Sequence, residues 1–509
     1  MDENPASDSR PARTGSFNPD TLVPHFIAEP LASKLALEEA QRATNADAPE
    51  TIYEIIIDLN TKFPRGRAAA RACVFDMLRR MQEHGESALT FRASTADTLP
   101  YVFASMTARN IRYLAQEMRS DSSGTAIFRI WEDHDVEGLI TQSISTVKAD
   151  AAHISFSAVG RGIVWAVLDT GIERDHPHFK KFANLDVAAP LEHRDYTLEG
   201  DDSLAEHDPN GHGTHVAGII AGADASPPGD PTAPGRITVL LQQRDESNAI
   251  SYTLETPSAI AGMAPQCKLL SLRVLDSKNR GRVSFVIEAL EYVQLLNEYG
   301  RNIVVHGVNM SLGYAFDPEW FACGQSPLCV EVDRLVRSGV SVIVAAGNSG
   351  YGYANTEFSG VWAQGMGMSI NDPANAELAI SVGSTHREMP HTYGVSYFSS
   401  KGPTGDGRRK PDVLAPGERI VSCAAGLAKT DLQKRSKSVA FDYLEDSGTS
   451  MAAPHVSGII AAFLSIRREF IGKPLDVKQI ILSTATDLRR DPNHQGAGLV
   501  DLMRAIQSV

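Results

Sequence analysis

The stretch Gly448-Thr449-Ser450-Met451-Ala452-Ala453-Pro454-His455-Val456 is followed by the apolar run Ile459-Ile460-Ala461-Ala462-Phe463-Leu464. Small and hydroxylic residues ahead of an apolar run predict a tight turn that places Ser450 in the first turn of a buried helix. Pro454 fits this position because the first N–H groups of a helix have no intrahelical partner to lose. A serine there lies beside a backbone N–H and the positive end of a helix dipole, which suit a developing negative charge. An ordinary helix cap at Thr449 or Ser450 explains the stretch alone equally well, so its meaning depends on the rest of the chain.

The composition is that of an ordinary soluble globular protein. The 509 residues are 42% hydrophobic and 22% charged, and the length favours about three domains. A net charge of −14 argues against a general affinity for nucleic acid or anionic membranes. No apolar run reaches the ~18 residues of a membrane span. We therefore expect neither a nucleic-acid partner nor a membrane partner.

Residues 1–48 are polar and have no apolar segment behind a basic start, so they predict a disordered leader rather than a secretory signal. Five cysteines in a chain of this length do not make a disulfide scaffold. Cys323 and Cys329 bracket a short loop and could either pair or stay reduced. These features together predict a cytoplasmic protein.

Residues 49–137 predict a small α+β domain of the ferredoxin-like type. β-Branched and aromatic residues indicate strands, and helical spacing of apolar residues indicates two helices, the second capped by Thr107. The expected strands span 51–57, 101–105 and 126–131, and the first expected helix spans 68–81. Alternation of this kind within about 90 residues can form a domain of its own.

Residues 138–509 predict a doubly wound α/β domain with a mostly parallel sheet. Continuous apolar runs, such as Ile163 to Leu168, are typical of parallel strands that are buried on both faces. Further strands are expected at 268–274, 303–310, 340–346 and 378–382, and helices at 283–299, 331–337 and 454–468. Residues 223–261, rich in proline and glycine, predict a surface insertion with a weak strand at 237–241.

Three polar residues in this domain follow apolar or glycine-rich segments as Ser450 does. Asp169 ends the first buried strand, where open α/β sheets place their chemistry. His212 lies between two glycines ahead of a small-residue helix. Asn348 ends another buried strand and offers an amide donor for an oxyanion. Each has an ordinary explanation as a cap or turn residue, but together they supply an orienting acid, a base and an oxyanion donor for Ser450.

Zinc binding by His212 and His215 is the rival interpretation of the histidine motif. The two are three residues apart, no glutamate completes an HExxH pattern, and the sequence offers no third ligand. We therefore favour a base over a metal ligand.

The motifs Val-Leu-Asp169-Thr-Gly, Gly-His212-Gly-Thr-His-Val-Ala-Gly, Ala-Ala-Gly-Asn348 and Gly-Thr-Ser450-Met-Ala-Ala-Pro-His resemble those of the subtilisin-like serine proteases, the subtilases. The resemblance covers about Gly138 to the C-terminus, and it implies a serine endopeptidase that works through an acyl-enzyme without a cofactor. His212 would take the proton of Ser450, Asp169 would orient His212, and Asn348 would bind the oxyanion.

The resemblance also implies a peptide-binding cleft. Protein or peptide substrates would lie as an added strand between two segments of this chain. One segment is Ser311, Leu312 and Gly313, the other is Asn279, Arg280 and Gly281, and Ala346 with Gly347 would wall the first specificity pocket. Tyr314 stands where relatives often have glycine, so it is expected to reshape the pocket.

The resemblance leaves structural calcium open. Many relatives carry an acidic calcium ligand after a His-Pro pair, but here His178 follows His176-Pro177. The loop that supplies further ligands in those relatives is replaced by the 223–261 insertion. The strong calcium site is therefore in doubt, and no metal ligands are assigned.

By element order and position, the small N-terminal domain is similar to the propeptides of the family. It would act as an intramolecular inhibitor, the acidic tail Glu132–Glu137 facing Arg280, with cleavage in residues 132–150 of a latent precursor. A permanently attached interaction domain is the alternative. For the whole chain, a catalytically silent subtilase-fold scaffold remains the second hypothesis. An α/β-hydrolase would need Gly-x-Ser-x-Gly and the order Ser…Asp…His, which this sequence lacks.

Overall fold

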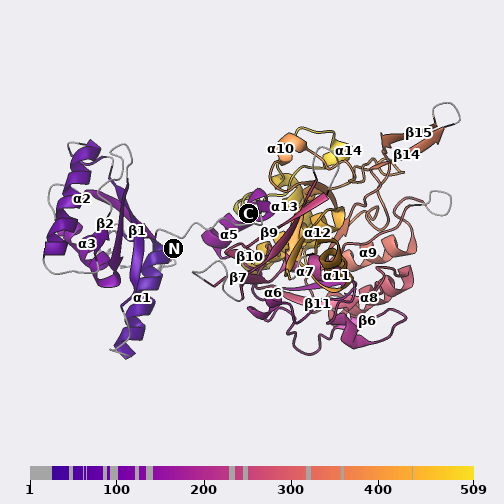
Figure 1. Cartoon of the computed structure of the whole chain (residues 1–509), viewed down its shortest axis with the longest axis horizontal. Helices are drawn as coiled ribbons and strands as arrows, with labels where there is room; N and C mark the ends of the chain where they lie inside the picture. The colour runs from indigo at the N-terminus through magenta and orange to yellow at the C-terminus, as the bar shows by residue number, and fades with distance from the viewer. Residues whose placement is uncertain are drawn as a thin grey trace, which may run out of the picture. The chain divides into compact units, whose positions relative to one another are not determined.

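The structure is a computed structural model, and it divides into two compact units, Met1–Val136 and Glu137–Val509 (Figure 1). The residues that it describes are 26–44, 50–60, 62–64, 66–83, 89–91, 101–120, 125–132, 142–227, 235–244, 250–316, 322–356, 360–437 and 440–509. The division lies one residue from the predicted domain boundary. The first 25 residues of the predicted leader and residues 133–137 of the predicted acidic tail lie outside the described residues.

The N-terminal unit has the ferredoxin-like order βαββαβ. Its elements are β1 (Ile52–Leu59), α2 (Gly66–Glu83), β2 (Thr90–Phe91), β3 (Tyr101–Thr107), α3 (Ala108–Ser120) and β4 (Ile127–Glu132). The sheet order is β2-β3-β1-β4, and β1 pairs antiparallel with both β3 and β4. Both helices contribute to a core with alternate residues of β1, such as Ile55 and Ile57 with Val74 and Ile111. As predicted, Thr107 caps α3, accepting a hydrogen bond from the Asn110 amide at 3.4 Å.

The prediction of a disordered leader up to residue 48 is wrong for α1 (Glu29–Thr44). Leu31 and Leu35, one helical turn apart, are buried in the core of this unit together with Phe26. The Glu38 carboxylate ties the helix to β1, because it accepts hydrogen bonds from the Thr51 amide (3.1 Å) and the Tyr53 hydroxyl (2.7 Å). A two-residue apolar stripe is enough to dock a helix but too narrow to stand out in a polar composition.

The second unit is built on a seven-stranded parallel sheet of order β17-β16-β13-β12-β5-β11-β6. Its strands are β5 (Val164–Asp169), β6 (Arg194–Asp195), β11 (Lys268–Arg273), β12 (Gly307–Met310), β13 (Ser341–Ala345), β16 (Ile380–His386) and β17 (Val413–Glu418). From β5 the chain adds β11 on one side and then β12 on the other. The strand order therefore reverses between β5 and β12, and open α/β sheets bind ligands at such a switch point.

Helices cover both faces of this sheet, as predicted for a doubly wound fold (Figure 1). One face carries α5 (Ala149–Phe156), α7 (His212–Ile220), α12 (Thr449–Ile466), α13 (Pro474–Thr484) and α15 (Leu502–Gln507), and the other carries α8 (Val283–Leu296) and α9 (Pro327–Arg337). Alternate residues of β5 enter the two cores: Trp165 and Val167 face one, Ala166 and Leu168 the other. Burial on both faces explains why β5 reads as an unbroken apolar run.

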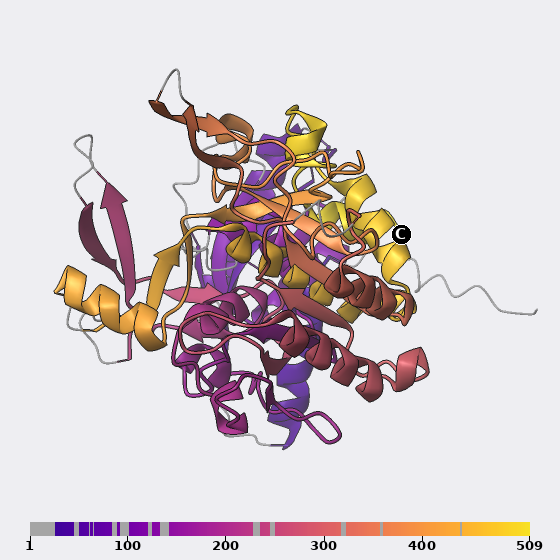
Figure 2. The same ribbon diagram turned by 90° about the vertical axis from the view of Figure 1, so that its right-hand side faces the viewer.

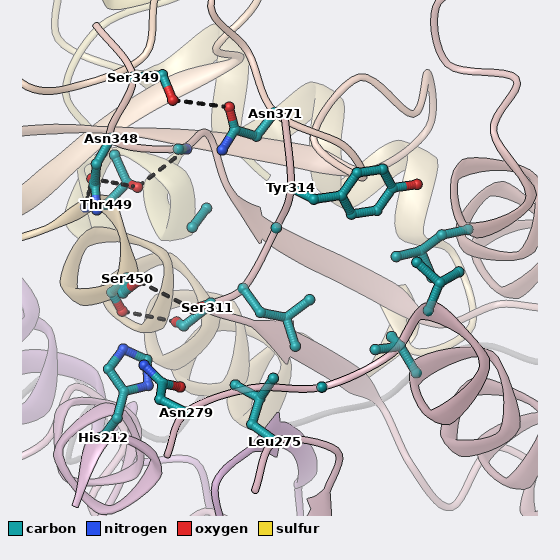
Figure 3. Close-up of a pocket in the computed structure, with 18 of the residues that line it drawn as sticks. His212, Leu275, Asn279, Ser311, Tyr314, Asn348, Ser349, Asn371, Thr449 and Ser450 are labelled. Atoms are coloured by element: carbon teal, nitrogen blue, oxygen red, sulfur yellow. Dashed lines mark hydrogen bonds between the residues drawn. The ribbon is translucent and has the colours of Figure 1, made fainter. Parts of the chain in front are cut away.

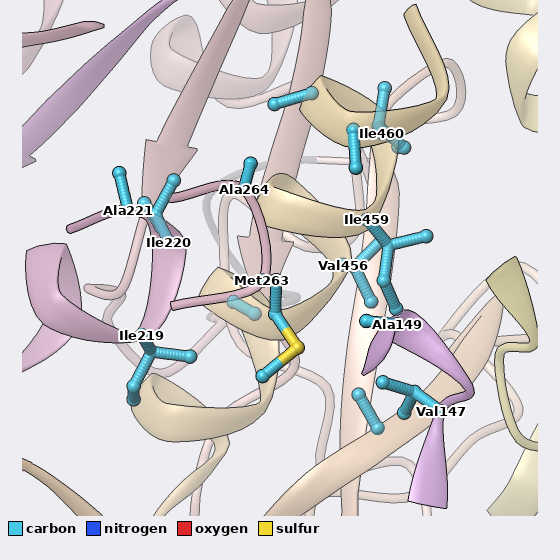
Figure 4. Packing of buried hydrophobic residues seen from close by; sticks show 14 of the residues in the cluster. Val147, Ala149, Ile219, Ile220, Ala221, Met263, Ala264, Val456, Ile459 and Ile460 are labelled. Carbon is cyan, nitrogen blue, oxygen red and sulfur yellow. The ribbon is translucent and has the colours of Figure 1, made fainter. Parts of the chain in front are cut away.

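Helix α12 is the central helix of this unit. Figure 4 shows Val456, Ile459 and Ile460 of α12 packed among residues of α7, the Met263–Ala264 turn and the start of α5. Against the expectation from the sequence, this helix is long and apolar enough to cross a membrane, but 83% of its most apolar window is buried inside the structure. Full burial of one such aliphatic side chain contributes about 1.5–3 kcal/mol. The protein itself therefore covers most of the apolar surface of this helix.

The described part of the 223–261 insertion contains more strands than the one weak strand predicted. It contributes β7 (Ala223–Ala225), β8 (Val239–Arg244), β9 (Ile250–Glu255) and β10 (Ala259–Ala261), and β8 joins β9, β18 (Ile420–Cys423) and β19 (Tyr443–Asp446) in a second sheet of order β18-β19-β8-β9. Ile237 and Val239 belong to the main core rather than to a surface excursion. Tyr252 of β9 packs in one cluster with Ala428 and Leu432 of α11 (Gly426–Ser436), and Figure 2 shows this hairpin and helix on the same side of the unit.

A second hairpin, β14 (Tyr351–Thr356) and β15 (Gly360–Gly365), projects from the unit and was not predicted (Figure 2). Among the described residues, the remaining helices are α4 (Gln142–Thr146), α6 (Pro177–Lys180), α10 (Pro390–Tyr393), α14 (Pro492–Gln495) and short 3-10 turns at Asp202–Ala205, Glu298–Gly300 and Arg468–Phe470. All five cysteines are free thiols, so Cys323 and Cys329 do not form a disulfide.

Candidate active site

A cleft of about 550 Å³ lies at the carboxyl ends of β5 and β12, where the sequence predicted the site. It brings His212, Ser450 and Asn348 to one wall (Figure 3). Most of the predicted substrate residues also line it: Ser311, Leu312, Gly313, Asn279, Gly281 and Gly347. Five segments far apart in the sequence thus converge on one open groove.

Asp169 and His212 form a close pair. Asp169 is the last residue of β5 and is almost completely buried, and His212 is the first residue of α7. The Nδ1 atom of His212 lies 2.7 Å from Oδ1 of Asp169, which also accepts the Thr170 amide at 2.8 Å. A carboxylate on Nδ1 fixes the tautomer that leaves Nε2 unprotonated and able to accept a proton.

Asp208, which the sequence analysis missed, joins the strand of Asp169 to the helix of His212. Its carboxylate is fully buried and accepts hydrogen bonds from the Thr170 hydroxyl (2.9 Å), the Gly211 amide (2.8 Å), and the Thr214 amide (2.9 Å) and hydroxyl (2.8 Å). Burial raises the pKa of Asp208, and these hydrogen bonds oppose that rise. The run Asp208-Pro-Asn-Gly is typical of an Asx-type turn, in which the aspartate side chain binds backbone N–H groups two and three residues later, and this signal could have identified it.

The surroundings of His212 favour its protonated form. Burial alone would lower its pKa, but the charge of Asp169 and its hydrogen bond outweigh burial, and the charges of Asp446 and Asp208 add to them. The result is a pKa raised to about 9. A neutral imidazole, the form that can act as a base, therefore becomes abundant only in alkaline solution.

Ser450 is the second residue of α12, as predicted, but Pro454 lies deeper in the helix than expected. A residue with an N–H at position 454 would donate to the Ser450 carbonyl, so the prediction that Pro454 has no intrahelical bond to lose is wrong. The Ser311 hydroxyl donates to that carbonyl instead, at 2.8 Å. In return, the Ser450 hydroxyl donates to the Ser311 carbonyl at 3.1 Å rather than to His212. One side-chain rotation would redirect this hydroxyl, and catalytic hydrogen bonds often form fully only with substrate bound.

Asn348 is oriented by Thr449. The side-chain oxygen of Asn348 accepts hydrogen bonds from the Thr449 amide (2.9 Å) and hydroxyl (3.0 Å), and the Thr449 hydroxyl in turn accepts the Gly347 amide at 3.2 Å. With its oxygen held, Asn348 presents its amide nitrogen over Gly448, where an added Cβ would lie 3.4 Å from it. Beside the start of α12, this nitrogen can donate to an oxyanion formed at Ser450.

Two of the predicted substrate residues do not line the cleft. Arg280 is exposed outside it, and Ala346 is fully buried behind the wall that Ala345 and Gly347 present. The carbonyl of Ala346 is used inside the structure, because it accepts the Asn371 amide at 3.0 Å. Both predictions missed which residue of a short segment faces the cleft, a detail that depends on the local backbone.

Tyr314 does line the cleft, as its unusual position suggested, and its hydroxyl is 3.2 Å from the Ser326 hydroxyl (Figure 3). The neighbouring end of the cleft is apolar, formed by the predicted substrate residue Leu312 together with four residues that the sequence did not identify: Leu275, Val283, Val286 and Leu328. These residues can bury an apolar side chain of an extended peptide.

The residues at the position of the family's calcium site do not fit calcium. His178 is buried, its ring nitrogens lie 3.2 Å from the Tyr443 hydroxyl and the Gly218 carbonyl, and burial lowers its pKa to about 3. Calcium requires six to eight oxygen ligands, which an imidazole does not supply. Among the described residues, no group of three or more His, Cys, Asp or Glu could hold a metal ion.

The fold and the cleft together define a class, the serine hydrolases that bind an extended chain on a doubly wound α/β domain. A model of the subtilase family matches residues 160–498, two thirds of the chain. Serine protease AprX of Bacillus subtilis is 28% identical over 389 residues, which cover 75% of this chain and 74% of AprX. Subtilisin E of the same organism is 27% identical over 392 residues (77% and 78%), and an intracellular serine protease of Paenibacillus polymyxa is 28% identical over 349 residues (67% and 80%). The chain belongs to the subtilase family and is a serine peptidase.

Proposed function

We propose that this protein is a serine endopeptidase in which Ser450 is the nucleophile, His212 the general base and Asp169 the group that orients His212. Ser450 attacks the substrate carbonyl, and its proton moves to Nε2 of His212 and then to the leaving amine. The Asn348 amide and the Ser450 backbone N–H bind the oxyanion. Water hydrolyses the acyl-enzyme, and no cofactor takes part.

The 2.7 Å contact between Asp169 and His212 carries this proposal, because it joins two residues 43 positions apart at the rim of a peptide-sized cleft. A fluorophosphonate probe tests it, since the probe phosphonylates an activated serine, with loss of fluoride. We expect labelling of the wild type, loss of labelling in Ser450→Ala and His212→Ala, and retention in Ser447→Ala, an exposed serine of the same turn. A wild type that stays unlabelled after its N-terminal unit has been removed would favour the catalytically silent scaffold.

The proposal includes a latent precursor that is inhibited by its own N-terminal unit. The helices of that unit cover one face of its sheet, and the other face carries an apolar row across three strands: Phe103, Ile56 and Trp131 lie opposite one another in the register. Trp131 is 38% exposed and Tyr101, beside this row, is 37% exposed. A solvated sheet face normally carries polar residues, so an apolar row marks a surface that binds a partner.

Ile56→Glu tests the inhibition. Ile56 lies on the uncovered face and outside the core of the unit, so a charge there would weaken binding and leave the unit folded. We expect a higher initial peptidase rate from the intact Ile56→Glu chain than from the wild type. Tyr113→Glu, a matched change on the exposed side of α3, should leave the rate unchanged. Equal rates for all three chains would favour a permanently attached interaction domain instead.

We further propose that the precursor cleaves itself within residues 132–141. The rest of the earlier range, up to residue 150, folds into α4 and α5, and Val147 and Ala149 are fully buried in the core of the peptidase unit. A cut there would require a buried helix to unfold. Mass spectrometry should find the N-terminal unit removed from the purified wild type and retained in Ser450→Ala. Trimming of pure Ser450→Ala would exclude self-processing.

The proposal also covers the cellular compartment of the enzyme and its calcium requirement. Five free thiols suit the reducing cytoplasm, where we place the protein. Activity that does not require added calcium is expected, because an imidazole at His178 replaces the oxygen donor of the family's site. Activity that disappears on treatment with a chelator and returns with calcium would contradict this part.

A further inference from the structure

Asn371 closes the specificity pocket, although no motif in the sequence analysis pointed to this residue. It precedes β16 and lines the cleft between the Ala345–Gly347 wall and the Ser311–Gly313 segment. An added Cβ on Gly347 would lie 2.6 Å from Cγ of Asn371, and one on Gly313 would lie 3.5 Å from its Cβ. The two glycines therefore leave the space that the Asn371 side chain fills.

The Asn371 amide is held in one orientation. Its backbone N–H donates to the Ala346 carbonyl at 3.0 Å, and its side-chain oxygen accepts the Ser349 hydroxyl at 3.3 Å. The Ser349 backbone is fixed in turn by the Ser400 hydroxyl, which accepts the Ser349 amide at 3.0 Å. Figure 3 shows the oxygen of Asn371 facing Ser349 and its nitrogen turned away from Ser349 toward the cleft. A donor and a hydroxyl acceptor thus lie side by side at the end of the pocket.

The surroundings of this pair are uncharged. The neighbouring cleft residues are Gly313, Gly347, Asn348 and Thr449. Besides His212, the charged residue among the described residues of the cleft is Arg282, which follows the Asn279–Gly281 segment on the opposite wall. A substrate ammonium would find no acid at Asn371, and a substrate carboxylate would find no cation. An aliphatic side chain would fit, but it would leave the Asn371 N–H without a partner.

We propose that Asn371 and Ser349 select a carboxamide, glutamine or asparagine, as the side chain of the residue whose carbonyl is attacked. The Asn371 nitrogen would donate to the substrate amide oxygen, and the Ser349 hydroxyl oxygen would accept from the substrate amide nitrogen. A primary amide is the side chain that offers both an acceptor and a donor at its tip. This inference rests on the proposed function, because it takes Ser450 as the nucleophile and thereby defines the pocket.

The test uses the full-length chain and fluorogenic peptides that differ only at this residue: glutamine, glutamate, methionine, leucine or lysine. Rates are divided by the amount of Ser450 that a fluorophosphonate titrates. We expect kcat/KM for glutamine to exceed that for methionine, of similar length, by about tenfold, the effect of one or two neutral hydrogen bonds. Asn371→Leu should abolish this ratio, and Ser349→Ala should reduce it severalfold.

Asn371→Asp is the matched variant, equal in size to the wild type but with a negative charge in place of the amide. It should shift the preference from glutamine to lysine, because a carboxylate at the end of the pocket pairs with an ammonium. A wild type that cleaves after methionine or leucine as fast as after glutamine would overturn the inference, and so would an unchanged ratio in Asn371→Leu. Absence of Ser450 labelling after removal of the N-terminal unit, by contrast, would refute the proposed function itself.

Discussion

Replacing Asp208 by asparagine tests whether the buried carboxylate holds the acid and the base in place. The change keeps the size of the side chain but leaves one oxygen where there were two. The Oδ2 atom accepts both the Thr214 amide and the Thr214 hydroxyl, and that hydroxyl already accepts the Glu173 amide at 2.9 Å. The hydroxyl can turn to a new partner, but the Thr214 amide cannot. At least one buried N–H therefore loses its acceptor, which costs about 1–3 kcal/mol.

The same change should slow catalysis more than it destabilises the fold. Thr170 adjoins Asp169 and Gly211 adjoins His212, so a shift of either segment misplaces the base, and a misplacement of about 1 Å can cost ~100-fold in rate. We expect kcat to fall by about 100-fold. The free energy of unfolding, measured in urea, should fall by about 1–3 kcal/mol. Unfolding is measured in the Ser450→Ala background, which prevents self-digestion.

Asp201→Asn is the control, because Asp201 is an exposed carboxylate that caps a short turn nearby through Ser203. It should change neither kcat nor the urea midpoint appreciably. An Asp208→Asn enzyme with wild-type kcat and a stability change below about 0.5 kcal/mol would refute the assignment of a positioning role.

Three further outcomes are expected. The peptidase rate should rise with pH through a midpoint near 9, where His212 loses its proton. Asp446→Asn should move that midpoint toward neutral pH, because it removes a negative charge that favours protonated His212. A midpoint unchanged by this variant would contradict the electrostatic argument. Ser311→Ala should destabilise the wild type by about 1–3 kcal/mol. It should cost less in a Pro454→Ala background, because residue 454 then has an N–H that can donate to the Ser450 carbonyl. Equal costs in both backgrounds would show that the Ser311 hydroxyl does not replace the missing helical hydrogen bond. The pKa of His178 in the folded protein lies near 3, below its value in the unfolded chain, so the free energy of unfolding should fall as the pH drops from about 6.5 toward 3. This group contributes up to ~1.4 kcal/mol per pH unit, and the fall should be smaller in His178→Gln. Parallel pH profiles of the two proteins would contradict this.

The parallel sheet and the position of the site could be predicted because their signals are local. Strands buried on both faces, such as β5 and β13, form apolar runs that polar residues end abruptly. The carboxyl ends of parallel strands lie at one edge of the sheet, so Asp169 and Asn348 could be expected near each other before any contact was known. Family motifs then identified the partners.

Features that depend on contacts distant in sequence could not be predicted. The strand β8 was predicted only as a weak strand at 237–241, because its pairing with β19, about 200 residues later, leaves little local signal in the sequence. Asn371 belongs to an irregular loop, and its place follows from the Ala346 carbonyl and the space beside two glycines. The inward turn of Ala346 and the depth of Pro454 in its helix likewise depend on backbone geometry that residue types alone do not determine.

The reciprocal hydrogen bonds between Ser311 and Ser450 have a consequence for selectivity. Each residue donates its hydroxyl to the other's backbone carbonyl. The Ser311–Gly313 segment, proposed to align a peptide, and the turn that carries Ser450 should therefore move together. A peptide that docks one residue out of register would displace that segment, and the displacement would reach Ser450 through both bonds. Poor substrates should therefore differ from good ones in kcat as much as in KM, because a misaligned chain would misalign the attacking atom as well.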